Sequence, residues 1–279
     1  MAQSSRNPPV SSRSGRRLVR LRTRFVSALG HRSQAAECRR AGRPLSGAMI
    51  LSDPDWKAVG SALDEQGWAV IPRLLGARAC VEAAALWRDE SRFRSRIAMA
   101  RHGFGRGEYR YFDYALPGPV ESLRSELYPR LADVANCWQE ALGRADRFPA
   151  AHADYLDRCR SAGQVRPTPL LLRYGPGDYN CLHQDLYGAE AFPLQAAILL
   201  SRPGEDFTGG EFLLSEQRPR RQSRATVVPV EQGDAVVFAV SERPVKGGRG
   251  FYRTRMKHGV STIRSGERFT LGIIFHDAA

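Results

Sequence analysis

The sequence predicts an α+β fold in which supporting helices precede a double-stranded β-helix core of the jelly-roll, cupin-like type. Two observations lead to this fold class. As far as about residue 165, apolar residues mostly recur at the three- and four-residue spacing of amphipathic helices. From residue 168 onwards, short apolar and β-branched runs alternate with Gly/Pro turns, and such a series of short strands indicates a sandwich or a barrel.

The helical part is expected to cover residues 49–165. Its first helix is predicted over 52–66, where Asp53 is a suitable N-cap and Pro54 suits the first helical position. The other elements predicted in this part are a short strand at 67–72, helices at 77–90, 119–142 and 149–162, and an irregular segment at 95–115 in which basic and aromatic residues interleave.

The jelly-roll core is expected to cover residues 166–279. Eight strands are predicted in it, at 168–174, 181–187, 192–200, 210–215, 223–230, 234–240, 254–263 and 267–276. A candidate metal-binding tripeptide ends the second of these strands, and a further histidine lies in the seventh. This placement matches a double-stranded β-helix.

The formal net charge of +13 is concentrated at the N-terminus. Residues 1–48 contain eleven Arg, no Lys and one acidic residue, Glu37, so this segment carries +10 and the rest of the chain only +3. Because the segment is rich in Ser, Arg and Pro and lacks hydrophobic periodicity, we expect a disordered basic tail. Its composition also resembles a transit peptide, and Met49 is an alternative start if the reading frame is over-extended. The domain itself is expected over residues 49–279.

Cysteine usage and hydropathy bear on the compartment. Five cysteines, an odd number without a C-x-x-C pair, argue against a disulfide framework or a zinc knuckle and predict a reducing cytoplasm. No stretch approaches the ~20 apolar residues of a membrane span, so we expect a soluble protein with no membrane partner. Nothing in the sequence points to an obligate protein partner.

Two H-x-D tripeptides are candidates for part of a metal site. His152 and Asp154 lie in a predicted helix, where positions i and i+2 point to different sides. His183 and Asp185 lie in extended chain, where the same two positions share a face and can meet one ion. His258, 75 residues further on, supplies a second imidazole. Two imidazoles and one carboxylate form a facial triad, which leaves positions open for an oxidisable cosubstrate and O2. We call His183, Asp185 and His258 the metal triad.

A basic residue follows the triad at a useful distance. Arg268 lies ten residues after His258 in an otherwise apolar strand, and its guanidinium can hold a carboxylate through two hydrogen bonds. Arg268 and Thr270 share one face of that strand, so both side chains can reach the same carboxylate.

From residue 168 to about 276 the chain resembles the Fe(II)- and 2-oxoglutarate-dependent dioxygenases. Residues 173–177 followed by 182–185 are similar to the strand and ligand segment of AlkB-type nucleic-acid dealkylases. Residues 200–212 and 271–277 support a similarity to a bacterial oxygenase family described as acting on damaged nucleic acid. AlkB-type enzymes carry a second arginine six residues after the first, where this chain has Ile274. The pair Arg268-x-Thr270 instead resembles the single-arginine pattern of prolyl hydroxylases.

The resemblance implies a role for each candidate residue. The metal triad would bind Fe(II), and 2-oxoglutarate would chelate the iron while Arg268 and Thr270 bind its far carboxylate. Tyr174 would donate a hydrogen bond to 2-oxoglutarate. The implied chemistry is O2 activation with loss of CO2, release of succinate and hydroxylation of a substrate C–H bond.

The substrate is less well defined by the sequence. Tyr179 and Tyr187 bracket the triad tripeptide and are candidates to line the substrate pocket. Arg220 and Arg221 belong to a basic loop that is expected near the mouth of the site. Such runs are usually solvated, yet beside a pocket they would suit single-stranded or damaged nucleic acid. The alternatives are a prolyl-hydroxylase-like protein hydroxylase, a small-molecule hydroxylase and a catalytically silent jelly-roll binding module.

Overall fold

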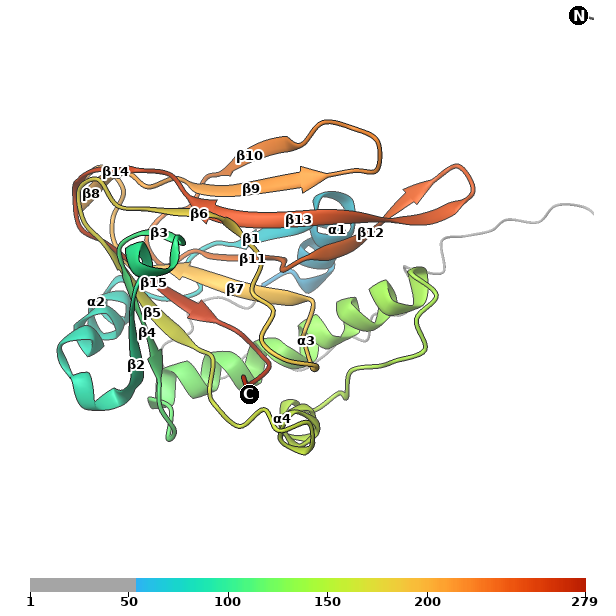
Figure 1. The fold of residues 1–279 in the computed structure, drawn as a ribbon, viewed down its shortest axis with the longest axis horizontal. Helices are drawn as coiled ribbons and strands as arrows, with labels where there is room; N and C mark the ends of the chain where they lie inside the picture. Colours follow the sequence, from blue (N-terminus) through green and yellow to red (C-terminus); the bar gives the residue numbers. More distant parts are fainter. Residues whose placement is uncertain (1–53) are drawn as a thin grey trace, which may run out of the picture. The chain divides into compact units, whose positions relative to one another are not determined.

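The computed structural model describes residues 54–279 (Figure 1). A seven-stranded antiparallel sheet, the major sheet, contains in spatial order β1 (Trp68–Ile71), β11 (Ala235–Ala239), β7 (Leu194–Leu199), β15 (Arg268–Ile273), β5 (Leu170–Tyr174), β4 (Glu108–Phe112) and β2 (Phe93–Ala98). The minor sheet contains β10 (Arg224–Val228), β9 (Phe212–Gln217), β13 (Gly250–Val260), β6 (Tyr179–His183) and β3 (Gly105–Arg106), and β12 (Glu242–Gly247) also pairs with β13. β14 (Ile263–Gly266) and β8 (Phe207–Gly209) form a two-stranded sheet. The expected α+β fold with a double-stranded β-helix core is confirmed.

The described residues form four α-helices: α1 (Trp56–Gln66), α2 (Ala77–Ala85), α3 (Gly118–Ala141) and α4 (His152–Ser161), with short 3-10 segments at 86–88, 90–92 and 99–102. α3 runs beside the major sheet (Figure 1). Apolar residues recur every four positions along it, and Leu127 and Leu131 are fully buried in one core cluster with Ile198 of β7 and Leu271 of β15. Helix α3 therefore covers one face of the major sheet and leaves the other face for the minor sheet and the site.

The N-terminal elements differ from the prediction at their ends. The carboxylate of Asp55 caps α1 by accepting hydrogen bonds from the main-chain N–H groups of Lys57 and Ala58, both at 3.0 Å. Asp53, the predicted cap, and the predicted basic tail lie outside the described residues. The helix predicted over 77–90 ends at Ala85 and continues as 3-10 segments.

The segment predicted to be irregular contains the last two strands at one side of the major sheet, of which β2 forms the edge. β2 pairs with β4, and β4 pairs with β5. Arg110, one of the basic residues that suggested a loop, is buried in β4. Its side chain donates to Glu108 at 2.9 Å and lies 4.2 Å from the ring of Trp87, and these contacts compensate its charge. This pairing depends on contacts distant in sequence, which the local composition does not reveal.

The second predicted strand, 181–187, is shifted toward the N-terminus. β6 ends at His183, which is the residue paired with His258 of β13, and Asp185 lies in the loop that follows. The other seven predicted strands are observed, with ends displaced by at most four residues. β8, β12 and β14 were not predicted. No helix among residues 54–279 combines the length and the apolar character that a membrane span requires.

Candidate active site

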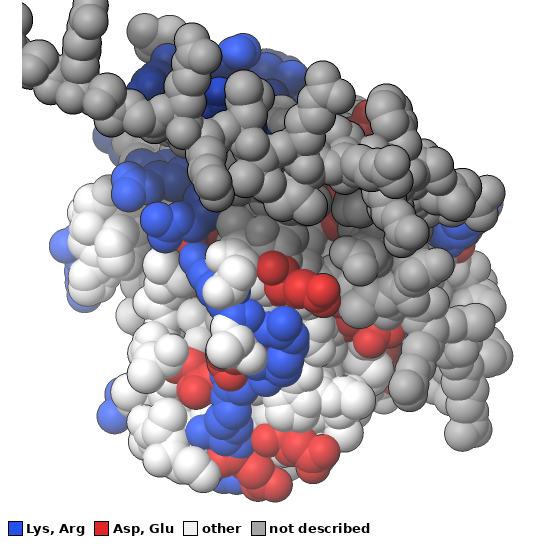
Figure 2. Space-filling view, turned by 90° about the vertical axis from the view of Figure 1, so that its right-hand side faces the viewer, with Lys and Arg blue, Asp and Glu red and all other residues white. Residues whose placement is uncertain are grey.

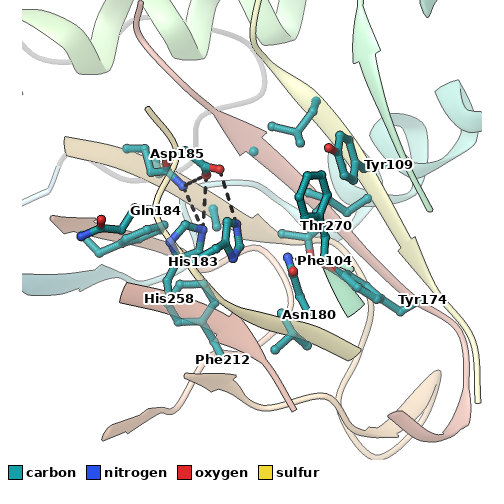
Figure 3. A pocket seen from close by; sticks show the side chains of 18 of the residues that line it. Phe104, Tyr109, Tyr174, Asn180, His183, Gln184, Asp185, Phe212, His258 and Thr270 are labelled. Carbon is teal, nitrogen blue, oxygen red and sulfur yellow. Dashed lines mark hydrogen bonds and ion pairs between the residues drawn. The ribbon is translucent and has the colours of Figure 1, made fainter. Parts of the chain in front are cut away.

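The metal triad is assembled by β6, β13 and the loop after β6. Because His183 and His258 are partners in neighbouring antiparallel strands, their imidazoles lie side by side, with ring centroids 4.1 Å apart. Asp185 leaves the sheet and turns toward both rings, as Figure 3 shows. One potential ligand atom of each residue lies within 4.8 Å of the others.

The dimensions of this cluster suit one metal ion. Nε2 of His183 lies 3.4 Å from Oδ1 of Asp185, and Nε2 of His258 lies 3.3 Å from Oδ2. Metal–ligand bonds of about 2.0–2.2 Å place neighbouring ligand atoms about 3 Å apart. The observed spacing is close to that value.

The hydrogen bonds and charges prepare the triad for a metal. Nδ1 of His183 donates to the main-chain carbonyl of Cys181 at 2.8 Å, which fixes the ring and turns Nε2 toward Asp185. Burial, and then the nearby His183, lower the pKa of His258 and favour the neutral imidazole that a metal needs. Burial alone would raise the pKa of Asp185, but hydrogen bonds with the two histidines hold it well below its usual range.

The triad lies on a cavity of about 200 Å³ between the two sheets. Figure 3 shows the triad at one end of this cavity and Tyr174 and Thr270 at the other. Aromatic side chains make up much of the wall, and small residues of the major sheet leave the space open: Phe104, Tyr109, Phe212 and Phe238, with Ala196, Ala197 and Gly272. The cavity can therefore hold a small ligand that reaches from the triad to the far end.

Arg268 provides a buried positive charge at this far end. It is the residue of β15 that pairs with Tyr174 of β5, and it is 1% exposed. Its Nη1 donates to the hydroxyl of Thr270 at 2.5 Å, whereas its Nε has no hydrogen-bond partner among the described residues. Burial lowers the pKa of Arg268 to about 10, although the neighbouring Tyr174 and Glu211 partly oppose this shift.

These features fit a dicarboxylic acid. A buried guanidinium with an unsatisfied donor is unfavourable until an anion pairs with it. Tyr174 is fully buried beside it, and its hydroxyl accepts a hydrogen bond from Asn180 at 3.3 Å, so its own proton is available to a ligand. A ligand with one carboxylate at Arg268 and metal-binding oxygens at the triad would satisfy both ends.

The structure brings some of the predicted substrate residues to the cavity and not others. Tyr187 lines it, and its hydroxyl donates to Oδ1 of Asp185 at 2.7 Å. Tyr179 pairs with Arg106 at the start of β6 and does not line the cavity. Arg220 and Arg221 occupy the turn between β9 and β10. Leu214 pairs with His258, and β9 continues for three more residues to Gln217 before the turn begins, so Arg220 and Arg221 lie beyond the end of the strand and do not line the cavity.

Sequence reasoning missed several residues of the site, of which Gln195 is the most informative. Gln195 lines the cavity, is 5% exposed and donates to Oδ2 of Asp185 at 2.9 Å. A polar residue within the otherwise apolar strand β7 was a usable signal. Phe104 and Asn180 also line the cavity, but neither stands out in its local sequence.

The fold and the site together define the class of protein. Two imidazoles and one carboxylate converging at a cavity are the donor set of a mononuclear non-haem iron oxygenase, and a buried arginine in the same cavity suits the second carboxylate of 2-oxoglutarate. The chain belongs to the Oxygenase-NA family, whose model, described as "Oxygenase, catalysing oxidative methylation of damaged DNA", matches residues 107–278. The predicted enzyme class, a 2-oxoglutarate-dependent oxygenase with Fe(II), 2-oxoglutarate and O2 as cofactors, is confirmed.

Other proteins are similar to the chain. An uncharacterised protein of Mycobacterium tuberculosis strain H37Rv is 51% identical over 168 residues, which are 60% of this chain and 72% of that protein. The structure of a Pseudomonas putida prolyl-4-hydroxylase is 18% identical, covers 77% of this chain and 95% of its own, and has a TM-score of 0.44. A 2OG-Fe(II) oxygenase-family protein of Burkholderia pseudomallei is 17% identical, covers 82% and 95%, and has a TM-score of 0.45. Likenesses of this strength carry no information about the substrate.

Proposed function

We propose that His183, Asp185 and His258 bind Fe(II), and that Arg268, together with Thr270 and Tyr174, binds the far carboxylate of 2-oxoglutarate. The observation that carries this proposal is the buried, incompletely paired guanidinium of Arg268 in the cavity on which the triad lies. When bound, the iron, 2-oxoglutarate and O2 supply the oxidation, which hydroxylates a substrate C–H bond and releases succinate and CO2.

The chain's own residues would bind 2-oxoglutarate, orient it and enclose it. Arg268 neutralises the far carboxylate, and the hydroxyl of Thr270 fixes the guanidinium by accepting from Nη1. Gly272 keeps the cavity open, because a Cβ there would lie 2.5 Å from a side-chain carbon of Leu170. The aromatic wall excludes water around the bound acid, which strengthens the charge pairing at Arg268.

Anaerobic titration tests these roles. Adding Fe(II) and 2-oxoglutarate to the protein is expected to produce the weak visible charge-transfer band of the chelate. The His183→Ala variant should lack the band, while His152→Ala, which changes the other H-x-D tripeptide, should retain it if folded. A folded wild-type protein without the band, or an unchanged band in His183→Ala, would refute the proposed site. Succinate release without added substrate separates an active oxygenase from a silent binding module.

We further propose that the substrate group is carried on single-stranded or damaged nucleic acid. The description of the family supports this, and so does the charge on the minor sheet. Arg253, Arg255 and Lys257 are exposed at alternate positions of β13, the strand that carries His258. Within the described part of the chain, Arg255 and Lys257 take part in no ion pair, and Arg253 has only a 3.8 Å contact with Glu242.

Further basic side chains lie at one end of the molecule. Figure 2 views the end of the molecule that carries the β9–β10 and β12–β13 turns, and lysine and arginine side chains gather in its upper part, whereas basic and acidic side chains alternate below. Because successive residues of a strand point to opposite faces, the row of basic residues on β13 lies on the face of that strand away from His258, where cations with few acidic partners suit a phosphate backbone. At the cavity, Phe104 is 47% exposed and its ring stacks on His102 with centroids 5.3 Å apart, which offers a platform for a base.

Salt dependence of oligonucleotide binding tests this substrate. In the complete chain, the double change Arg255→Ala and Lys257→Ala should lower the slope of log affinity against log salt by about 1.4 for a single strand. The matched control, Arg78→Ala with Arg202→Ala, removes the same charge beside α2 and should leave the slope nearly unchanged. Equal slopes in both variants would show that Arg255 and Lys257 do not contact a nucleic acid.

One observation favours a second candidate, a peptide hydroxylase. Ile274 is buried against Tyr111 and Leu170, so the second arginine of AlkB-type enzymes has no equivalent at this position. A succinate-release screen with methylated oligonucleotides, proline-containing peptides and small metabolites decides between the candidates.

We also propose a reducing compartment such as the cytoplasm, which the free thiols of Cys80, Cys159 and Cys181 support.

A further inference from the structure

Gln195 links the two sheets at the metal triad. It belongs to β7 of the major sheet, in which the other residues of the strand are apolar. It contacts His258, which belongs to β13 of the minor sheet, and Asp185, which lies in the loop after β6. With 5% of its surface exposed, Gln195 places a polar amide in an apolar layer.

Its contacts concentrate on the two triad residues. Nε2 of Gln195 donates to Oδ2 of Asp185 at 2.9 Å and lies 3.3 Å from Nε2 of His258. From the opposite side of the carboxylate, the hydroxyl of Tyr187 donates to Oδ1 at 2.7 Å. Each oxygen of Asp185 therefore accepts one hydrogen bond from a residue outside the triad.

The rest of the amide argues against a purely structural role. Oε1 of Gln195 is buried and has no hydrogen-bond partner among the described residues. An unsatisfied buried oxygen disfavours folding, and an apolar residue of the same size would avoid this penalty. The strand would thus be more stable with Leu or Met at this position, unless the amide serves the carboxylate.

We propose that Gln195, together with Tyr187, is a positioning residue that holds the Asp185 carboxylate in its ligating orientation before the metal arrives. This inference rests on the proposed function. Asp185 lies in a loop, so its side chain lacks the constraint that the strands give to the two histidines. A carboxylate with a donor on each oxygen has fewer orientations available, and a ligand held in this way loses less freedom when it binds the ion.

The two donors also limit a competing arrangement. Both oxygens of Asp185 lie within 3.4 Å of an imidazole nitrogen, so without a metal the carboxylate can pair with the histidines. Donors from Gln195 and Tyr187 satisfy the carboxylate from outside the triad, so that its orientation depends less on these contacts. Removing them should therefore weaken the metal site without disturbing the sheets.

Metal affinity in the complete, metal-free protein tests the proposal. Mn(II), followed by electron paramagnetic resonance, is the probe, because it needs neither O2 nor 2-oxoglutarate. Gln195→Leu and Gln195→Met should each bind Mn(II) about tenfold to a hundredfold more weakly. Tyr187→Phe, which removes only the hydroxyl, should weaken binding in the same direction. The midpoint of thermal unfolding of the metal-free Gln195 variants should be equal to or above that of the wild type.

The control is Gln232→Leu, which removes a glutamine amide away from the triad. The amide of Gln232 donates to the main-chain oxygen of Leu200. It should leave Mn(II) affinity unchanged. Wild-type affinity in Gln195→Leu, Gln195→Met and Tyr187→Phe would overturn the positioning role, and so would a loss confined to variants that also unfold. Failure of the wild-type protein to bind Mn(II), or retention of binding in His258→Ala, would instead refute the proposed metal triad.

Discussion

The guanidinium of Arg268 donates a 2.5 Å hydrogen bond to the hydroxyl of Thr270, and the two residues share one face of β15. This contact leaves Nε of Arg268 without a partner among the described residues. The pair is therefore arranged to bind an anion.

Replacing Arg268 with Ala should weaken 2-oxoglutarate binding roughly tenfold to a hundredfold, because a charge-assisted contact of about 1.5–3 kcal/mol is lost. Mn(II) affinity should change little, since Arg268 lies at the far end of the cavity from the triad. Calorimetric titration of each ligand measures both quantities. Thr270→Val is the companion variant and should cause a smaller loss of 2-oxoglutarate affinity. A parallel loss of metal and 2-oxoglutarate binding in Arg268→Ala would mean that Arg268 supports the fold.

A second buried arginine should matter for stability instead. Arg124 of α3 is fully buried, pairs with Asp277 at 2.7 Å and donates to the carbonyl of Ile274 at 2.9 Å. Arg124→Met leaves Asp277 as an unpaired buried charge, so the free energy of unfolding should fall by about 3–5 kcal/mol. Urea denaturation measures this, with Arg78→Met as a control at an exposed ion pair, where little change is expected. Similar stability in the two variants would contradict the prediction.

The pH dependence of stability should depend partly on His152. Burial, and then the charge of Arg124, lower the pKa of His152 to about 4, compared with about 6.5 in the unfolded chain. Since the unfolded state binds this proton more readily, the contribution of His152 is complete above about pH 6.5 and is lost as the pH falls toward 4. At pH 5 the loss should be about 1–2 kcal/mol.

The comparison that isolates His152 uses His152→Gln. The drop in unfolding free energy between pH 7 and pH 5 should be smaller in this variant than in the wild type by about 1–2 kcal/mol. His276 shifts in the same direction and remains in both proteins, so part of the acid sensitivity should persist. An identical drop in the two proteins would show that His152 stays neutral in the unfolded chain as well, or is charged in the folded one.

The sequence contained enough information to predict that His183, Asp185 and His258 group together, although only the two histidines lie in paired strands and Asp185 reaches them from the loop after β6. The alternation of β15 likewise placed Arg268 beside Thr270. Strands β2 and β4 were not predictable in this way, since the pairing of β4 with β5 and of β2 with β4 is a tertiary contact.

Contacts between the sheets were also beyond local reasoning. Gln195 meets Asp185 and His258 only after the major and minor sheets face each other, so its role follows from the fold and not from its neighbours in sequence. Arg220 and Arg221 are the opposite case, in which residues near the site in sequence lie away from it in the fold. They belong to a basic run near strands of the site, but the β9–β10 hairpin extends their turn away from the cavity.

The exposed ring of Phe104 supports a last prediction about substrate binding. If a base stacks on Phe104, the Phe104→Ala variant should bind single-stranded oligonucleotides about 5- to 150-fold more weakly, corresponding to about 1–3 kcal/mol. The slope of log affinity against log salt should stay unchanged, because the ring contacts no phosphate. This separates Phe104→Ala from the Arg255 and Lys257 changes, which should alter the slope.

Fluorescence anisotropy at several salt concentrations provides both quantities for Phe104→Ala. Val81→Ala, at a residue 63% exposed on α2, controls for the loss of exposed apolar surface and should bind as the wild type does. The affinity for 2-oxoglutarate should be the same in both variants, since Arg268 and Thr270 are untouched. An oligonucleotide affinity in Phe104→Ala equal to that in Val81→Ala would exclude a stacking platform at the cavity and favour a substrate without a base, such as a peptide.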